Sequence, residues 1–319
     1  MSRALAALLA LLLGGAARAQ QEGRGMDGVE AALARLREDR FRGDLSAFVQ
    51  DGRVRSAALA RAAQALREER GEAREEVARL VVALGTETDP LRARGALVVR
   101  DPSVVAVLVT DGLLLADPAK DVVLDALRLH VPAPLLAPHT AALLEDLRRA
   151  PDASMLLVLA RLKPPEGAAA LEALLKREPA WEREPETRLA RAALGDERLE
   201  EELVDAFLAA TDPERKVALA RDLGRVASER ALRALASELR TELVVREPYT
   251  ERSARLDLLE ALVPSFLEEP ALLPHRILSD EDYGRVEAWA EQRFGIVWDR
   301  PRPPFMTKHG IPHPPDGGD

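Results

Sequence analysis

Three features of this 319-residue sequence predict an all-α fold: aliphatic rather than aromatic apolar content, a recurring helix-start motif, and apolar stripes at helical spacing. Hydrophobic residues make up 47% of the chain but aromatic residues only 3%, so the apolar part is mainly Ala, Leu and Val. This composition favours close-packed helices over a β-sandwich, which uses more β-branched and aromatic side chains. The length suits one large domain, two ordinary domains or an elongated repeat array.

The first 19 residues have the pattern of a secretory signal peptide. Arg3 provides a positive start, residues 4–13 form an apolar run, and a small-x-small cleavage site ends at Ala19. An uncleaved anchor is the weaker alternative, because a membrane span needs about 20 apolar residues. We expect cleavage after Ala19, a flexible spacer over residues 20–27, export to the periplasm or beyond, and no membrane span after cleavage.

Charge and cysteine content exclude several classes of partner and site. The formal net charge is -9 and basic residues are interspersed with acidic ones, whereas a nucleic-acid surface concentrates basic residues. We therefore expect no nucleic-acid partner. The chain also has no Cys, so it has no disulfide framework and no thiol nucleophile.

The clearest structural unit runs over residues 211–239. Asp212 can cap a helix that has Pro213 at its first position, and a Thr211 capping box is an alternative start one residue earlier. Ser228 can cap a second helix after a short turn. The two predicted helices carry apolar stripes, which consist of Val217, Ala220, Leu223 and Gly224, and of Ala231, Leu232, Leu235, Ala236 and Leu239. The unit therefore predicts a helical hairpin.

Similar openings recur along the chain. Their prolines are Pro90, Pro118, Pro151, Pro185, Pro213 and Pro248, at gaps of 28, 33, 34, 28 and 35 residues. Basic residues follow four of these prolines within about three positions, namely Arg92, Lys120, Arg188 and Arg215 with Lys216. These residues and spacings resemble the HEAT-repeat family, as an exported, bacterial-type member. The resemblance implies an α-solenoid of antiparallel helix hairpins over residues 28–298; a less regular all-helical bundle is the alternative.

Other residues mark expected helix boundaries. Residues 51–85 predict a further hairpin, with Gly71 at the turn and Gly85 ending the second helix. Residues 26–39 predict a capping helix at the start of the array. The prolines of residues 127–149 predict a break between helices.

The motifs of common enzyme classes are missing from the sequence or explained more simply. It contains neither H-E-x-x-H nor G-x-S-x-G, and the G-x-G-x-x-G match at residues 23–28 is preceded by the signal peptide instead of a strand. Ser279 with the acidic residues after it predicts a helix cap, and a calcium loop is the weaker alternative. Catalysis by paired Asp and Glu residues stays open, and we expect no cofactor and no metal.

The C-terminal region concentrates aromatic and proline residues. Six of the eleven aromatic residues fall after position 265, and a last helix with Val286, Trp289, Ala290 and Phe294 on its inner side is expected to close the array. Residues 299–319 predict an extended, proline-rich tail. The candidate end-capping or partner-binding residues are Trp298, Phe305, His309 and His313; a metal site would need further ligands such as Asp299 or Asp316.

Two functions follow from these features as hypotheses. The first is a non-catalytic, exported scaffold that holds a protein partner in the cell envelope, on a concave surface lined by residues such as Leu199–Ala209 and Ala231–Leu239. The second is an enzyme, or an enzyme accessory subunit, that acts on a small molecule or a cell-envelope component. The tail either packs across the last repeats or extends to bind a partner.

Overall fold

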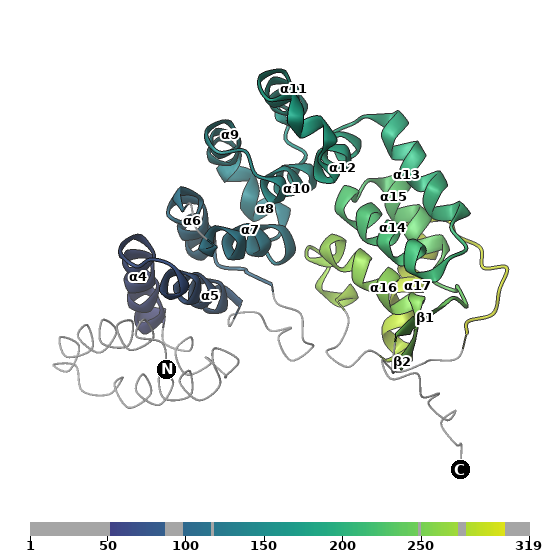
Figure 1. Cartoon of the computed structure of the whole chain (residues 1–319). Coiled ribbons are helices and arrows are strands. Elements are labelled where there is room, and N and C mark those ends of the chain that lie inside the picture. Colours follow the sequence, from purple (N-terminus) through teal and green to yellow (C-terminus); the bar gives the residue numbers. More distant parts are fainter. Residues whose placement is uncertain (1–51, 87–97, 116–117, 248–249, 274–278, 304–319) are drawn as a thin grey trace, which may run out of the picture. The chain divides into compact units, whose positions relative to one another are not determined.

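The computed structural model describes residues 52–86, 98–115, 118–247, 250–273 and 279–303. The chain is all-α in class, because these residues form mostly helices and one two-stranded sheet (Figure 1). The predicted signal peptide, the spacer, the helix over residues 26–39 and the opening at Pro90 lie outside the described residues. The chain divides into two compact units, with the boundary after Val158.

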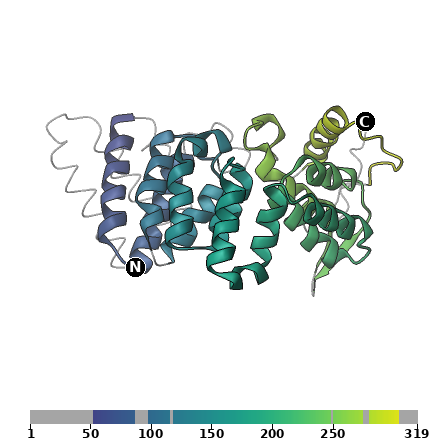
Figure 2. The ribbon, with the colours of Figure 1, turned by 90° about the horizontal axis from the view of Figure 1, so that it is seen from above.

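The first unit contains consecutive helices that pack on one another. In this unit α4 contacts α5, α5 contacts α6 and α7, and α6 contacts α9. Figure 2 shows the early helices side by side. The bounds are α4 Gly52–Glu68, α5 Glu72–Thr86, α6 Pro102–Thr110, α7 Ala119–Leu129, α8 Ala133–Leu136, α9 Thr140–Arg149 and α10 Ala153–Leu162, of which α10 crosses into the second unit.

The second unit has a core around α14, which contacts α12, α13, α15 and α16. The last helix, α17, packs on α15. The bounds are α11 Gly167–Arg177, α12 Pro185–Ala193, α13 Glu197–Ala209, α14 Pro213–Val226, α15 Glu229–Ser237, β1 Val244–Glu247, β2 Thr250–Ser253, α16 Ala254–Leu262 and α17 Asp280–Phe294.

The predicted helix starts of the 211–239 unit are confirmed. Asp212 is the N-cap of α14, where its carboxylate accepts a hydrogen bond from Arg215 N at 2.8 Å. Ser228 is the N-cap of α15, and its Oγ accepts one from Ala231 N at 3.0 Å. The cap therefore lies at Asp212 and not at the alternative Thr211. Both predicted apolar stripes are buried.

Three of the basic residues that follow the repeated prolines form ion pairs with a later helix. Lys120 Nζ of α7 lies 2.8 Å from Asp146 Oδ2 of α9, and both side chains are buried. Arg188 Nη2 of α12 lies 2.8 Å from Glu202 Oε2 of α13, near the surface. The third pair, Lys216 with Glu238, joins α14 to the end of α15. These pairs tie the first turn of one helix to its neighbour.

Two glycines allow helices to approach closely. Gly85 does not end α5 as predicted, because the helix continues to Thr86; a Cβ at Gly85 would lie 2.8 Å from Val99 Cγ1. Gly85 therefore allows close packing. In the sequence, a glycine with this role looks the same as a glycine that ends a helix. In the second unit, a Cβ at Gly224 of α14 would lie 2.4 Å from the carbonyl oxygen of Ala261 of α16. The predicted turn at Gly71 is confirmed, with φ +58°.

The helix predicted to open at Pro248 is wrong. Residues on both sides of it form an antiparallel pair, in which Val244 pairs with Ser253 and Glu247 with Thr250. A residue before proline is restricted to extended conformations, and valine and threonine favour strands, so a hairpin forms here. The helix begins only at Ala254, where Ser253 Oγ accepts a hydrogen bond from Arg255 N.

The predicted break within residues 127–149 is confirmed. After α7 ends at Leu129, the chain forms the single turn of α8 and a short 3-10 segment, Ala137–His139, before α9 begins. Proline cannot supply the N–H that a continuous helix needs at each position, so three prolines divide this stretch. Pro185 lies at the first position of α12 as predicted, whereas Pro118 lies one residue before α7.

Candidate functional site

The candidate site is centred on a buried carboxylate of the last helix. Glu287 of α17 has only 1% of its side chain exposed. On the same helix Asp280 and Gly284 precede it by seven and three residues, so all three lie on one face. The start of α17 is fixed by a capping box, because Ser279 Oγ accepts from Asp282 N and Asp282 accepts from Ser279 N. This cap confirms the role predicted for Ser279.

Three arginines from separate elements point at Glu287. Arg240, which follows α15, donates from Nη2 to Glu287 Oε2 at 3.0 Å. Arg302, beyond α17, donates to the same oxygen from Nε at 2.9 Å. Arg255 of α16 is farther away, with Nη2 3.9 Å from Glu287 Oε1. A buried carboxylate needs such charge-assisted partners, since an unpaired charge in a protein interior is costly.

Arg255 is itself almost fully buried. Its Nε donates to the carbonyl oxygen of Leu239 at 2.8 Å, and its guanidinium lies 4.3 Å from the ring centre of Tyr283. Burial lowers the pKa of Arg255 from its ordinary value, although Tyr283 and Glu287 act in the opposite direction. Burial also raises the pKa of Tyr283 well above its ordinary value. The Arg255 side chain is therefore positioned by the carbonyl oxygen of Leu239, the ring of Tyr283 and the carboxylate of Glu287.

Residues 300–303, which we call the C-terminal segment, lie against these arginines. Arg240 Nη1 donates to the carbonyl oxygen of Arg300 at 2.8 Å. Arg255 Nη1 donates to the carbonyl oxygen of Pro303 at 3.0 Å. Arg240 thus contacts both Glu287 of α17 and the C-terminal segment. Arg255 contacts both the carbonyl oxygen of Leu239 and the C-terminal segment. We call Arg240, Arg255, Asp280, Gly284 and Glu287 together the arginine seat.

The side chain of Arg302 bridges the two acidic residues of the arginine seat. Its Nη1 lies 3.2 Å from Asp280 Oδ2, while Nη2 lies 2.8 Å from Glu287 Oε2. Between them, a Cβ at Gly284 would lie 3.5 Å from Nη2, so the guanidinium rests over this glycine. Burial alone lowers the pKa of Arg302, but hydrogen bonds and charges from Glu287 and Asp280 raise it above its ordinary value.

Trp298 is the one candidate from the sequence that falls in the described residues. Its Nε1 donates to Glu291 Oε1 at 2.6 Å, and the guanidinium of Arg240 lies 4.6 Å from its ring centre. The structure therefore places Trp298 beside the arginine seat. The other three candidates, Phe305, His309 and His313, lie outside the described residues.

The inner side of α17 packs as predicted at most positions. Val286, Ala290 and Phe294 are buried. Trp289 is half-buried, and its ring meets those of Phe266 and Phe294 edge to face, with centroid distances of 5.0 and 5.3 Å. Edge-to-face contacts of this kind add to the stability that ring burial provides. They hold α17 on the second unit and so position the arginine seat.

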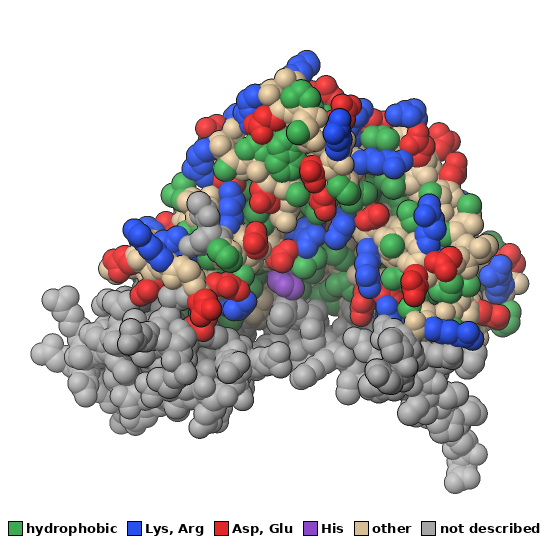
Figure 3. All heavy atoms as spheres, in the orientation of Figure 1, with side chains coloured by type: hydrophobic (Ala, Val, Ile, Leu, Met, Phe, Trp, Pro, Cys, Tyr) green, Lys and Arg blue, Asp and Glu red, His purple; other side chains and the backbone are tan. Residues whose placement is uncertain are grey.

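The two segments expected to line a binding surface differ in exposure. Within Leu199–Ala209, Leu208 is 46% exposed, whereas Leu199, Leu203, Val204 and Phe207 are buried. Within Ala231–Leu239, α15 buries its apolar side chains and contacts α13, α14, α16 and α17. On the face that Figure 3 shows, acidic and basic side chains are interspersed over the described residues.

Sequence reasoning missed all five residues of the arginine seat and also Arg302. The contacts of these residues with one another and with the C-terminal segment join positions 15 to 60 residues apart in the chain. The sequence did contain one indication of the site. The spacing of Asp280, Gly284 and Glu287 places two acidic side chains on one helix face, with a glycine that has no side chain between them. The arginines that this face attracts carry no local pattern.

The described residues contain no group of three or more His, Cys, Asp or Glu side chains that could hold a metal ion. Over the same part of the chain, none of the helices has the length and apolar character needed to cross a bilayer. No family model, no curated protein and no solved structure matches this sequence. Among the described residues, the arginine seat combines donors for carbonyl oxygens with two carboxylates for a cation.

Proposed function

We propose that this protein is a non-catalytic, exported interaction scaffold that holds a protein partner in the cell envelope. One observation carries the proposal: Arg240 and Arg255 hold residues 300–303, a stretch without helix or strand, by its carbonyl oxygens. Capture of main-chain groups is a common way for a protein surface to bind an extended peptide. The carboxylates of the arginine seat add a charged contact to the same stretch.

The architecture we propose for the scaffold is a HEAT-like α-solenoid. Support comes from the runs α4 to α7 and α12 to α16, in which each helix contacts the next, and from the capped starts at Asp212 and Ser228. The ion pairs of Lys120, Arg188 and Lys216 each link the first turn of one helix to a later helix. Stacked helix pairs present extended surfaces, which suits a binding role.

Export is the part of the proposal that rests on sequence alone. The positive start, the apolar run and the small-x-small site ending at Ala19 support a cleaved signal peptide. A measured N-terminus at Gln20 in the protein recovered from the periplasm or medium is the expected result. An intact Met1 in the cytoplasmic fraction would contradict it.

Affinity capture from the envelope fraction tests the scaffold. The bait is the mature chain, with a Leu208→Asp variant as a second bait, because Leu208 is an exposed apolar residue of a predicted lining segment. We expect a partner that the mature chain enriches and that binds it again when both are purified. Failure to find any such partner, together with measured turnover of an envelope substrate, would favour the enzyme alternative.

A further inference from the structure

The arginine seat contacts features that many extended peptides share. Arg240 and Arg255 donate to carbonyl oxygens two residues before and one residue after Arg302. The side-chain contact is the pairing of the Arg302 guanidinium with Glu287 and Asp280. The arginine seat thus binds one arginine side chain and the main-chain carbonyl groups on both sides of it.

The residues on either side of Arg302 are prolines. Pro301 and Pro303 each lack a main-chain N–H, hold φ at about −65° and restrict the residue before each of them to extended conformations. Such a segment brings carbonyl acceptors, and few competing donors, to the two donating arginines. It also loses little conformational entropy on binding, as in other proline-rich ligands.

The geometry over α17 fits an arginine better than a lysine. One planar guanidinium reaches Asp280 and Glu287 at once and lies over Gly284, where a larger side chain would stand in its place. A lysine ammonium is a compact point charge without the forked donors that span two carboxylates. The seat therefore selects for a guanidinium at this position.

The rim of the arginine seat is open to water while its base is not. The side chains of Asp280 and Arg302 are 56% and 34% exposed, so this ion pair is only partly shielded from solvent. The side chain of Arg255, by contrast, is 3% exposed. When the C-terminal segment leaves, the buried Arg255 loses a carbonyl acceptor, and another peptide carbonyl can replace it.

We propose that the arginine seat is a binding site for an extended peptide of a partner protein, with an arginine between two prolines, and that the C-terminal segment occupies it in cis. The proposal rests on the scaffold function and names the chemistry of its partner. Exchange in trans follows from the contacts: the same two carbonyl acceptors and one guanidinium can come from another chain. The cis segment then acts as a competing, autoinhibitory ligand.

Competition from the tethered segment sets the expected affinities. A short connection between two binding groups gives an effective concentration of about a millimolar or more, so a free peptide must displace a ligand that is already present. The mature chain is therefore expected to bind a free peptide at least about tenfold more weakly than a chain that ends at Asp299.

Fluorescence anisotropy with a labelled synthetic peptide of residues 300–307, RPRPPFMT, tests the proposal directly. We expect saturable binding to the mature chain truncated after Asp299. Changing Arg302→Lys in the peptide is expected to weaken binding about tenfold, the effect of losing roughly one charge-assisted hydrogen bond. The matched peptide with Arg300→Lys should bind as the original does, because the contact of Arg300 is through its carbonyl oxygen.

Two protein variants in the truncated chain localise the binding. Gly284→Leu places a branched side chain where the guanidinium lies and should abolish binding, whereas Gly284→Ala leaves ordinary contact distances and should preserve it. Glu287→Gln should weaken binding to the arginine peptide. If the truncated chain does not fold, the full mature chain with Arg302→Ala is used. This variant keeps the C-terminal segment but removes the side chain that pairs with Asp280 and Glu287.

A folded truncated chain that does not bind the peptide would overturn the proposal, and so would equal binding of the Arg302→Lys peptide. These results are separable from the test of the scaffold. Partner capture by the mature chain without peptide binding would leave the scaffold and remove this site. Peptide binding without any captured partner would keep the site and count against the proposed function.

Discussion

Lys216 Nζ, in the first turn of α14, lies 2.9 Å from Glu238 Oε2 at the end of α15 and 4.6 Å from the ring centre of Phe207 on α13. One ammonium thus joins three successive helices through an ion pair and a cation–π contact. Only 3% of the lysine side chain is exposed, so it has few alternatives in water. The pair is a structural link whose strength can be measured.

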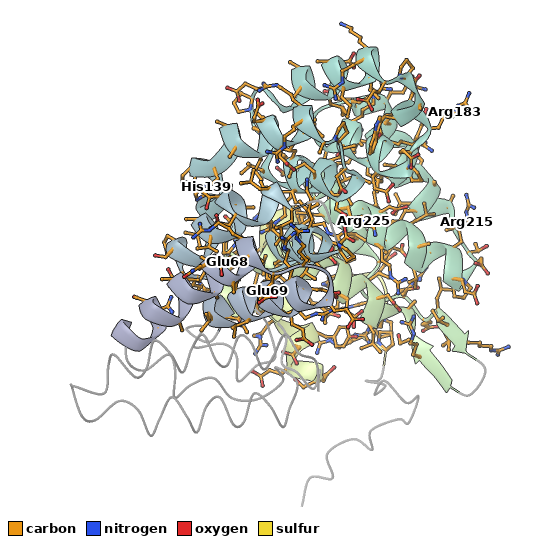
Figure 4. All side chains as sticks on the ribbon, turned by 60° about the vertical axis from the view of Figure 1, so that its left-hand side comes forward. Glu68, Glu69, His139, Arg183, Arg215 and Arg225 are labelled. Atoms are coloured by element: carbon orange, nitrogen blue, oxygen red, sulfur yellow. The ribbon has the colours of Figure 1, made fainter. Side chains whose placement is uncertain are left out.

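Replacing Lys216 by Met should lower the free energy of unfolding by about 1–3 kcal/mol, because Glu238 loses its buried partner while remaining partly open to water. Chemical denaturation gives the value. Arg215→Ala is the matched control: this neighbouring side chain is exposed and points away from the helix in Figure 4. It should change stability by less than about 0.5 kcal/mol; an equal loss in both variants would contradict a specific role for the pair.

Asp212→Ala should destabilise the protein by about 1 kcal/mol, since the α14 start loses the carboxylate that accepts from Arg215 N. Thr211→Ala, one residue earlier, tests the alternative cap and should be nearly neutral. Thermal unfolding followed by circular dichroism compares the two variants. A larger effect at Thr211 than at Asp212 would show that the helix start has been assigned to the wrong residue.

Gly224→Ala should cost about 1–3 kcal/mol or more, because the new Cβ would meet the carbonyl oxygen of Ala261 at 2.4 Å and push α14 away from α16. The same exchange at Gly284 is the control. There the new Cβ would have ordinary contacts, and removing a helical glycine should add about 0.5–1 kcal/mol. Both values come from denaturant titrations, and a tolerated Gly224→Ala would mean that the two helices are not closely packed.

Asp121→Asn should stabilise the protein at pH 7 and have no effect well below pH 3.8, the ordinary pKa of the group. Partial desolvation raises the pKa of Asp121, an exposed residue in the first turn of α7, and neighbouring carboxylates add to the shift, while Lys120 opposes it. Because the folded chain then holds the proton more tightly than the unfolded chain, stability falls as pH rises from this value through the raised pKa.

Denaturation midpoints of the unchanged protein and of the Asp121→Asn variant, measured from pH 3 to pH 7, should therefore diverge as pH rises. Equal midpoints at every pH would show that Asp121 is ionised as easily in the folded protein as in the unfolded chain. The neighbouring acids that raise its pKa are Asp152, Asp125 and Glu75.

Truncation after Asp299 should lower the free energy of unfolding by about 1–3 kcal/mol, because the buried Arg255 loses the carbonyl acceptor of Pro303 and Glu287 loses Arg302. Thermal shift measurements compare the truncated and mature chains. Adding the RPRPPFMT peptide should restore part of the lost melting temperature, since a ligand of the folded state stabilises it. An unchanged melting temperature after truncation would indicate that the segment contributes no stability.

Much of the local structure could be predicted because it depends on nearby residues. The caps at Asp212, Ser228 and Ser279 each involve groups within three positions of one another, so a sequence pattern specifies them. The hairpin around Pro248 was missed because a proline followed by an Ala- and Leu-rich stretch also occurs at helix starts. Strand pairing there depends on residues that face each other across the turn.

The amino-acid sequence by itself determined that this chain is helical, where several helices begin, and which stripes are apolar, because these properties arise from spacings of three and four residues. Only the tertiary structure decided that Glu287 is buried, that Arg240, Arg255 and Arg302 meet it, and that Gly85 is a packing contact and not a helix stop. The physical reason is that burial and ion pairing depend on distances between elements, which residues far apart in the chain establish together.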